Sequence, residues 1–74
     1  MANHKVYQIV PSGGWWQIRF ENSFVSTHRL KDEAITAGQK IASGKQPSQL
    51  VVQRADGTVE TEWTYADDSL PLKG

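Results

Sequence analysis

The sequence predicts an α+β fold: a two-layer sandwich in which one amphipathic helix packs on an antiparallel sheet of two hairpins. Two pairs of strand-like segments are each separated by a glycine-containing turn, and a single segment between them has helical periodicity. An apolar sheet face and an apolar helix stripe must both leave water, so we expect each to cover the other. The expected order of elements is ββ(β)αββ.

The first hairpin is predicted from residues 5–10 and 15–20. The first of these segments is rich in β-branched and aromatic side chains and ends at Pro11, which cannot donate to a strand ladder. Residues 11–14 have the composition of a turn. The expected cross-strand pairs are Ile9 with Trp16 and Tyr7 with Ile18. Because side chains alternate between faces, Trp16 belongs to the apolar face and Trp15 to the opposite one.

A short third strand at residues 24–28 and a helix from Lys31 to Ser43 are expected next. Apolar and small residues recur in the helix at spacings of three and four, and polar residues lie opposite them. Acids in the first turn and Lys40 near the end suit the helix dipole, and Gly44 is a suitable C-cap. Gly38 lies within the buried stripe, where we expect it to allow a bulky group such as Trp16 to approach.

The second hairpin is predicted from residues 49–54 and 58–65. The Asp56-Gly57 pair between two strands favours a type I′ turn. The expected cross-strand pairs are Arg54 with Val59, Val52 with Thr61 and Leu50 with Trp63 on the helix-facing side, and Val51 with Glu62 and Gln53 with Glu60 on the other. This arrangement places both glutamates on the face that the helix does not cover.

These elements define one domain, residues 1–66, and a C-terminal tail, residues 67–74, in which Leu70 and Leu72 could dock on the domain. Such a short chain has only a small core. The residues expected to be buried are Tyr7, Ile9, Trp16, Ile18, Phe20, Ile35, Ile41, Leu50, Val52 and Trp63.

Composition indicates a soluble, cytoplasmic protein without a membrane partner. The 74 residues include no cysteine, no signal-peptide pattern and no apolar run long enough to span a bilayer. The net charge is zero but unevenly distributed. Residues 1–55 hold seven Lys or Arg against three acids, a net charge of +4, and residues 56–74 hold five acids against one lysine, a net charge of −4.

No catalytic, cofactor-binding or metal-binding residues are expected, and the chain is not expected to be an enzyme. Ser26, His28 and Asp32 lie close in sequence, but a catalytic triad is recognised by geometry and usually draws on separate elements. His4 and His28 lack the spacing of a zinc site, and the Asp67-Asp68 pair is more typical of a solvated tail than of a cation site. The Gly13-Gly14 pair is not followed by the Lys-Ser/Thr ending of a phosphate loop.

The remaining candidate is an interaction face on the side of the sheet away from the helix. Trp and Arg are enriched at the energetic centres of protein interfaces. The residues expected to form this face are Trp15, Val6, Val10, Arg19 and Val51. They predict binding of another protein or formation of a homodimer. The alternative is that these side chains only pack across the strands, without a partner.

The order of motifs resembles the small bacterial family called domain of unknown function 2188. A Val-Pro-x-Gly-Gly-x-Trp-x-Ile-Arg segment is followed by Ser-x-His, a Lys-x-Glu-Ala-Ile helix start, Leu-Val-Val, Asp-Gly and a Pro- and Lys-Gly-containing tail. The matching residues are Val10, Pro11, Gly13, Gly14, Trp16, Ile18, Arg19, Ser26, His28, Lys31, Glu33, Ala34, Ile35, Leu50, Val51, Val52, Asp56, Gly57, Tyr65, Asp68, Pro71, Lys73 and Gly74. Leu30 stands where the family usually has threonine, and Trp15 where a small residue is common. The resemblance implies a single domain and brings no activity with it.

Residues 24–35 are also similar to part of the hybrid-binding N-terminal domain of ribonuclease H. That similarity implies an alternative function, binding of duplex RNA or an RNA–DNA hybrid near Arg29 and Lys31. The corresponding basic surface would consist of Arg19, Arg29, Lys31, Lys40 and Lys45. The acidic second hairpin argues against it, because acids repel a phosphate backbone.

Overall fold

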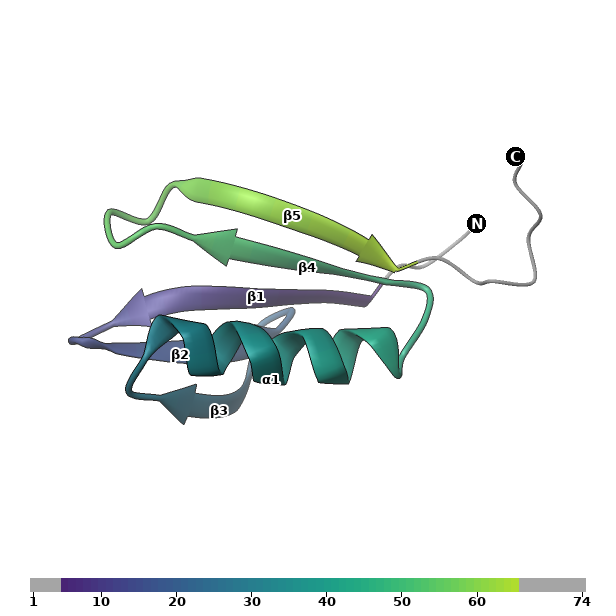
Figure 1. Cartoon of the computed structure of the whole chain (residues 1–74), viewed down its shortest axis with the longest axis horizontal. Coiled ribbons are helices and arrows are strands. Elements are labelled where there is room, and N and C mark those ends of the chain that lie inside the picture. The colour runs from purple at the N-terminus through teal and green to yellow at the C-terminus, as the bar shows by residue number, and fades with distance from the viewer. Residues whose placement is uncertain (1–4, 66–74) are drawn as a thin grey trace.

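The computed structural model describes residues 5–65, which form five strands and one helix. The elements are β1 (Lys5–Ser12), β2 (Trp15–Phe20), β3 (Ser23–His28), α1 (Lys31–Ser43), β4 (Ser48–Gln53) and β5 (Val59–Tyr65). The strands form one sheet in the order β3-β2-β1-β4-β5 (Figure 1). The helix lies across one face of this sheet, which confirms the predicted two-layer α+β class.

The sheet is mixed rather than wholly antiparallel. Each hairpin is antiparallel, as is the β2–β3 pair, but the two halves of the sheet meet where β1 pairs with β4 in parallel. The helix explains this pairing, because it carries the chain back along the sheet and β4 then begins at the end where β1 begins (Figure 1). The sequence expectation of a purely antiparallel sheet was therefore wrong at this one junction.

The first hairpin closes more tightly than expected. Ser12 pairs with Trp15, so only Gly13 and Gly14 lie between the strands. Both glycines have positive φ, 58° and 86°, as a two-residue type I′ turn requires. The strands therefore pair two residues away from the predicted register, with Ile9 opposite Ile18 and Tyr7 opposite Phe20. A shift of two residues leaves every side chain on its predicted face.

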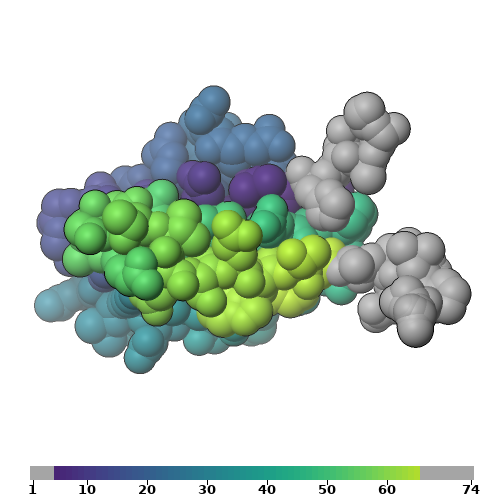
Figure 2. Space-filling view, turned by 90° about the horizontal axis from the view of Figure 1, so that it is seen from above, coloured from purple at the N-terminus to yellow at the C-terminus, as the bar shows by residue number. Residues whose placement is uncertain are grey.

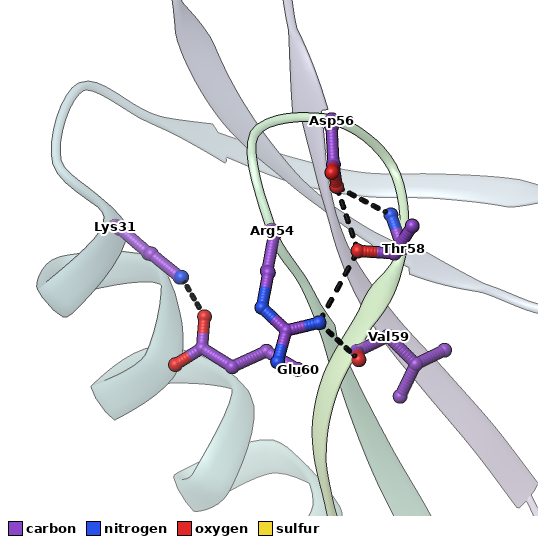
Figure 3. A network of polar contacts seen from close by, with 6 residues as sticks. All are labelled: Lys31, Arg54, Asp56, Thr58, Val59 and Glu60. Atoms are coloured by element: carbon purple, nitrogen blue, oxygen red, sulfur yellow. Dashed lines mark hydrogen bonds and ion pairs between the residues drawn. The ribbon is translucent and has the colours of Figure 1, made fainter.

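The second hairpin turns through a three-residue loop instead of the expected type I′ turn. Arg54 N–H donates to Thr58 O at 2.7 Å, and Gly57 N–H donates to Arg54 O at 2.8 Å. Of the three loop residues, 55–57, only Gly57 has positive φ. Asp56 Oδ1 accepts hydrogen bonds from the backbone N–H and the hydroxyl of Thr58, at 3.0 and 2.7 Å (Figure 3). Such a loop with a final left-handed glycine is the next commonest hairpin connection after the two-residue turns.

An irregularity after this loop changes the end of the β4–β5 ladder. The pairs Leu50–Trp63, Val51–Glu62 and Val52–Thr61 form as predicted, but Gln53 lies opposite Val59 and the register shifts. The predicted pairs of Arg54 with Val59 and Gln53 with Glu60 were wrong. The extra residue in β5 allows Glu60 to form an ion pair with Lys31 of α1 (Figure 3). Glu60 therefore reaches toward the helix layer instead of sharing a face with Glu62.

The helix has the predicted bounds and ends at Gly44. Its buried side is made of Ala34, Gly38 and Ala42. A Cβ at position 38 would lie 3.0 Å from Leu50 Cδ1 and 3.1 Å from Ile9 Cδ1. The absence of a side chain thus admits these two core residues, and the expectation that Trp16 fills this space was wrong.

The core lies between α1 and the central strands. Buried apolar residues there are Tyr7, Ile9, Ile18, Ala34, Ala42, Leu50 and Val52, and Trp16, Phe20, Ile35 and Ile41 pack against them half-buried. Trp63 was expected in this core, but its side chain is 36% exposed. It lies on β5, at the edge of the sheet, whereas the main contacts of the helix are with the other four strands.

The predicted tail, residues 67–74, lies outside the described residues, and so do Leu70, Leu72, His4 and the Asp67-Asp68 pair. Within residues 5–65, no helix has the length and apolar character needed to cross a membrane.

Candidate functional site

The candidate site is the outer face of the sheet, defined here as the face opposite α1. No other element of residues 5–65 covers it (Figure 1). Strand alternation places the five predicted residues on this face, because their neighbours along the chain point into the core. The register makes most of them contiguous. Val10 is a diagonal neighbour of Trp15 on β2. Val6 and Val10 are both diagonal neighbours of Val51 on β4.

The exposure of these residues is uneven. Trp15 is 46% exposed, whereas Val6 and Val10 are half-buried. Val51 is only 9% exposed, because it lies between Gln8 of β1 and Glu62 of β5. The prediction that Val51 contributes accessible surface was therefore wrong. Trp15 is the large apolar group that this cluster presents to solvent.

Trp15 has a cationic neighbour that the sequence prediction missed as part of this face. The guanidinium carbon of Arg29 lies 5.9 Å from the centroid of the Trp15 ring. The β2–β3 register explains this contact: Gln17 pairs with Thr27, and continuing the ladder by two residues brings residue 29 beside residue 15. The sequence predicts a role for Arg29 only in the alternative nucleic-acid surface.

Arg19, which the sequence predicts on the interaction face, is held by hydrogen bonds within the β2–β3 hairpin. Its guanidinium donates to Gln17 Oε1 at 3.1 Å and to Asn22 O at 2.9 Å. These bonds brace the β2–β3 turn and occupy donors that a partner would otherwise use. Opposite Arg19 the structure places Phe24, 57% exposed, as a second aromatic group on the outer face.

A hollow of about 350 Å³ lies beside Trp15, at the end of the molecule where both hairpins turn. Its lining consists of Pro11, Gly13, Gly14, Trp15, Trp16 and Ala55. Because glycine lacks a side chain, the first turn leaves the edges of both tryptophans accessible. Such a hollow next to an exposed aromatic side chain could accept an apolar side chain from a partner.

The Ser26 and His28 pair does form a contact. Ser26 Oγ and His28 Nε2 are 3.0 Å apart on the helix-facing side of the edge strand β3. Asp32 lines the same open hollow of about 510 Å³ as His28, together with Glu33, Thr36, Ala37 and Lys40. Among the described residues no carboxylate hydrogen-bonds to His28, so nothing there orients the imidazole as in a triad. The described residues contain no group of three ligands suited to a metal ion.

The residues of the predicted basic surface do not lie together. Arg19 and Arg29 belong to the outer face, whereas Lys31 and Lys40 lie on α1 and Lys45 follows its C-terminus. Lys31 is further engaged, since its ammonium lies 5.2 Å from the centroid of the Trp16 ring and pairs with Glu60 (Figure 3).

Comparison with known protein families gives a match over residues 7–65 to a family described as uncharacterized protein conserved in bacteria (DUF2188). The chain belongs to the DUF2188 family. This confirms the resemblance drawn from the motifs. No curated protein and no solved structure gives a significant match.

The DUF2188 assignment covers nearly all the described residues and carries no activity with it. Leu30 and Trp15, the two positions at which the motif resemblance implies a departure from the family, are both exposed. Leu30 is the N-cap of α1 and provides no side-chain hydrogen bond there. Trp15 is at the centre of the candidate site.

Proposed function

We propose that this DUF2188 protein is a non-catalytic interaction module that binds a protein, either another chain or a second copy of itself, through the outer face at Trp15. The observation that supports this most strongly is the exposed Trp15–Arg29 pair on a sheet face that no described element covers. Trp and Arg are the residue types that most often dominate binding energy at interfaces. The absence of cysteine suits the cytoplasm, where we place this activity.

The surroundings of Trp15 add to the proposal. Val10 lies diagonal to the indole, and the hollow beside it provides a place for a partner side chain. The β1–β2 pairing holds the tryptophan next to a tight turn, so little backbone freedom is lost on binding.

Light scattering across a concentration series tests the proposal, followed by capture from an extract of the native cells. Trp15→Ser is compared with Leu30→Ala, because Leu30 is also a large exposed apolar residue but is the N-cap of α1 and belongs to neither sheet face. We expect loss of self-association or of the captured partner with Trp15→Ser alone. A chain that stays monomeric and captures no partner that depends on Trp15 would contradict the proposal.

Nucleic-acid binding, the alternative suggested by sequence, has one supporting feature: Trp15 with Arg29 could stack on a base. The division of the basic residues between two layers weighs against it. Anisotropy titrations with duplex RNA, hybrid and single strands at about 50 mM salt separate the two functions, because phosphate attraction is strongest at low salt. We expect no affinity better than roughly millimolar; tighter binding that Trp15→Ser abolishes would favour the alternative.

A further inference from the structure

The strand β5 forms one edge of the sheet and has a free side within the described part of the chain. It pairs only with β4 there, over seven residues without a proline. Figure 2 looks onto this edge, and the yellow-green atoms of β5 lie at the front of the described residues, facing the viewer. Alternate backbone N–H and C=O groups of an edge strand point away from the sheet and can pair with an added strand.

This edge is acidic. Residues 55–65 contain Asp56, Glu60 and Glu62 and no Lys or Arg, and the cation that reaches the start of β5 is Arg54, whose Nη1 donates to Val59 O at 2.9 Å (Figure 3). Asp56 is bonded to Thr58, and Glu60 pairs with Lys31. Glu62 is exposed on the outer face and accepts a hydrogen bond from Gln49 Nε2 at 3.0 Å, and no ion pair within residues 5–65 includes it. The edge therefore presents a carboxylate that has no cationic partner in the described structure.

The charges disfavour pairing of β5 with β5 of a second copy. An antiparallel pair centred on Glu62 sets the two Glu62 side chains of the copies against each other. A pair centred on Trp63 makes the Glu62 side chains diagonal neighbours. Like charges in these positions are destabilising.

A strand of the opposite charge suits the edge, and we propose that β5 accepts an extended segment of another protein in which basic and apolar residues alternate. The basic residues of that strand would face Glu62 on the outer face. Its apolar residues would contact Trp63, whose side chain is 36% exposed on the helix-facing side. This strand-addition site is separate from the Trp15 site and does not depend on it.

The proposal is tested with a capped, fluorescently labelled peptide of about eight residues that alternates lysine and valine, the length of a typical strand. Anisotropy at about 50 mM salt compares the wild type with Glu62→Lys, and with Glu21→Lys as a control of equal charge change in the exposed β2–β3 turn. We expect Glu62→Lys to weaken binding about tenfold and Glu21→Lys to change it less than about twofold. A peptide with glutamate in place of lysine should regain affinity for Glu62→Lys.

Amide hydrogen exchange distinguishes strand addition from simple charge attraction. Peptide binding should slow exchange in part of residues 59–65, and N-methylation of alternate peptide amides should abolish binding. Trp15→Ser should bind the lysine peptide as well as the wild type does. Equal weakening by both charge reversals, unchanged exchange in β5, or slow exchange along its outer edge before peptide is added would overturn the proposal.

Discussion

Arg29 and Trp15 form a cation–π pair on the outer face, with 5.9 Å between the guanidinium carbon and the ring centroid. The two residues come from segments that the β2–β3 ladder brings together. At an exposed position such a pair contributes about 0.5–1 kcal/mol to folding. Its greater effect is to hold the indole in one orientation, which lowers the entropy lost when a partner binds.

Replacement of Arg29 by glutamine should therefore affect binding more than folding. We expect Arg29→Gln to lower the free energy of unfolding by less than about 1 kcal/mol and to weaken association that depends on Trp15 about tenfold. Urea unfolding and light scattering measure the two effects. Arg19→Gln is the control: it loses bonds within the hairpin, and we expect it to reduce stability with little change in association. The reverse ranking of the two variants in association would contradict this role for Arg29.

A hydroxyl at position 30 should stabilise the helix. Leu30 has the extended backbone of an N-cap residue, φ −112° and ψ 143°, but provides no side-chain acceptor for the first-turn N–H groups. Because Leu30 is 59% exposed, removing its side chain costs little burial. We expect Leu30→Ser to raise the free energy of unfolding by about 1 kcal/mol and Leu30→Ala to leave it nearly unchanged. Thermal unfolding in which the serine and alanine variants coincide would show that no cap forms.

Acidification should weaken the second hairpin through Asp56. Hydrogen bonds from the Thr58 hydroxyl and backbone N–H hold the pKa of Asp56 below its ordinary value of 3.8. A carboxyl whose pKa is lowered by folding stabilises the protein above its unfolded pKa, and this contribution is lost as the pH falls through the folded pKa. The stability difference between the wild type and Asp56→Asn should therefore be full above about pH 5 and decrease below about pH 4.

Urea unfolding between about pH 2 and pH 6 measures this dependence. Thr58→Val removes the hydroxyl donor, and it should raise the pKa of Asp56 as followed by carboxyl NMR. A difference between wild type and Asp56→Asn that is the same at every pH would contradict the prediction.

A side chain larger than methyl should not fit at position 38. The space there is filled by the Leu50 and Ile9 side chains. Gly38→Val improves intrinsic helix propensity but forces two γ-methyl groups against these residues, and overpacking of this kind costs about 1–3 kcal/mol. Thr36→Val, on the exposed side of α1, should change stability by less than about 0.5 kcal/mol. A Gly38→Val protein as stable as the wild type would show that the helix can move away from the sheet.

The helix and the two faces of the sheet could be predicted because they depend on local periodicity. The apolar spacing gave the bounds Lys31 and Ser43, and the alternation in β2 placed Trp15 and Trp16 on opposite faces even though the hairpin register was two residues off. Side chains along a strand alternate between the two faces with a period of two residues, so a shift of two residues leaves each side chain on the same face.

Features that depend on the order of strands could not be read from local patterns. The exposure of Trp63 follows from the place of β5 at the sheet edge, and the burial of Val51 from its place between β1 and β5. The lengths of both turns were also predicted wrongly, because Gly13-Gly14 and Asp56-Gly57 both suit a type I′ turn and only the pairing of the flanking strands decides between loop lengths. Arg29 was not predicted as part of the outer face, because it lies between β3 and α1 and strand alternation does not reach it.

Hydroxyl-radical labelling of Trp15 relative to Trp63 tests the use of the outer face most directly. The two tryptophans are similarly exposed and lie on opposite faces, so the ratio of their labelling rates cancels differences in radical dose. The ratio is measured by mass spectrometry in dilute purified protein, in a concentration series and in an extract of the native cells. We predict that the ratio falls about fivefold or more at high concentration or in the extract, as expected when an interface centre is desolvated. A ratio that stays constant under all three conditions would contradict binding through Trp15.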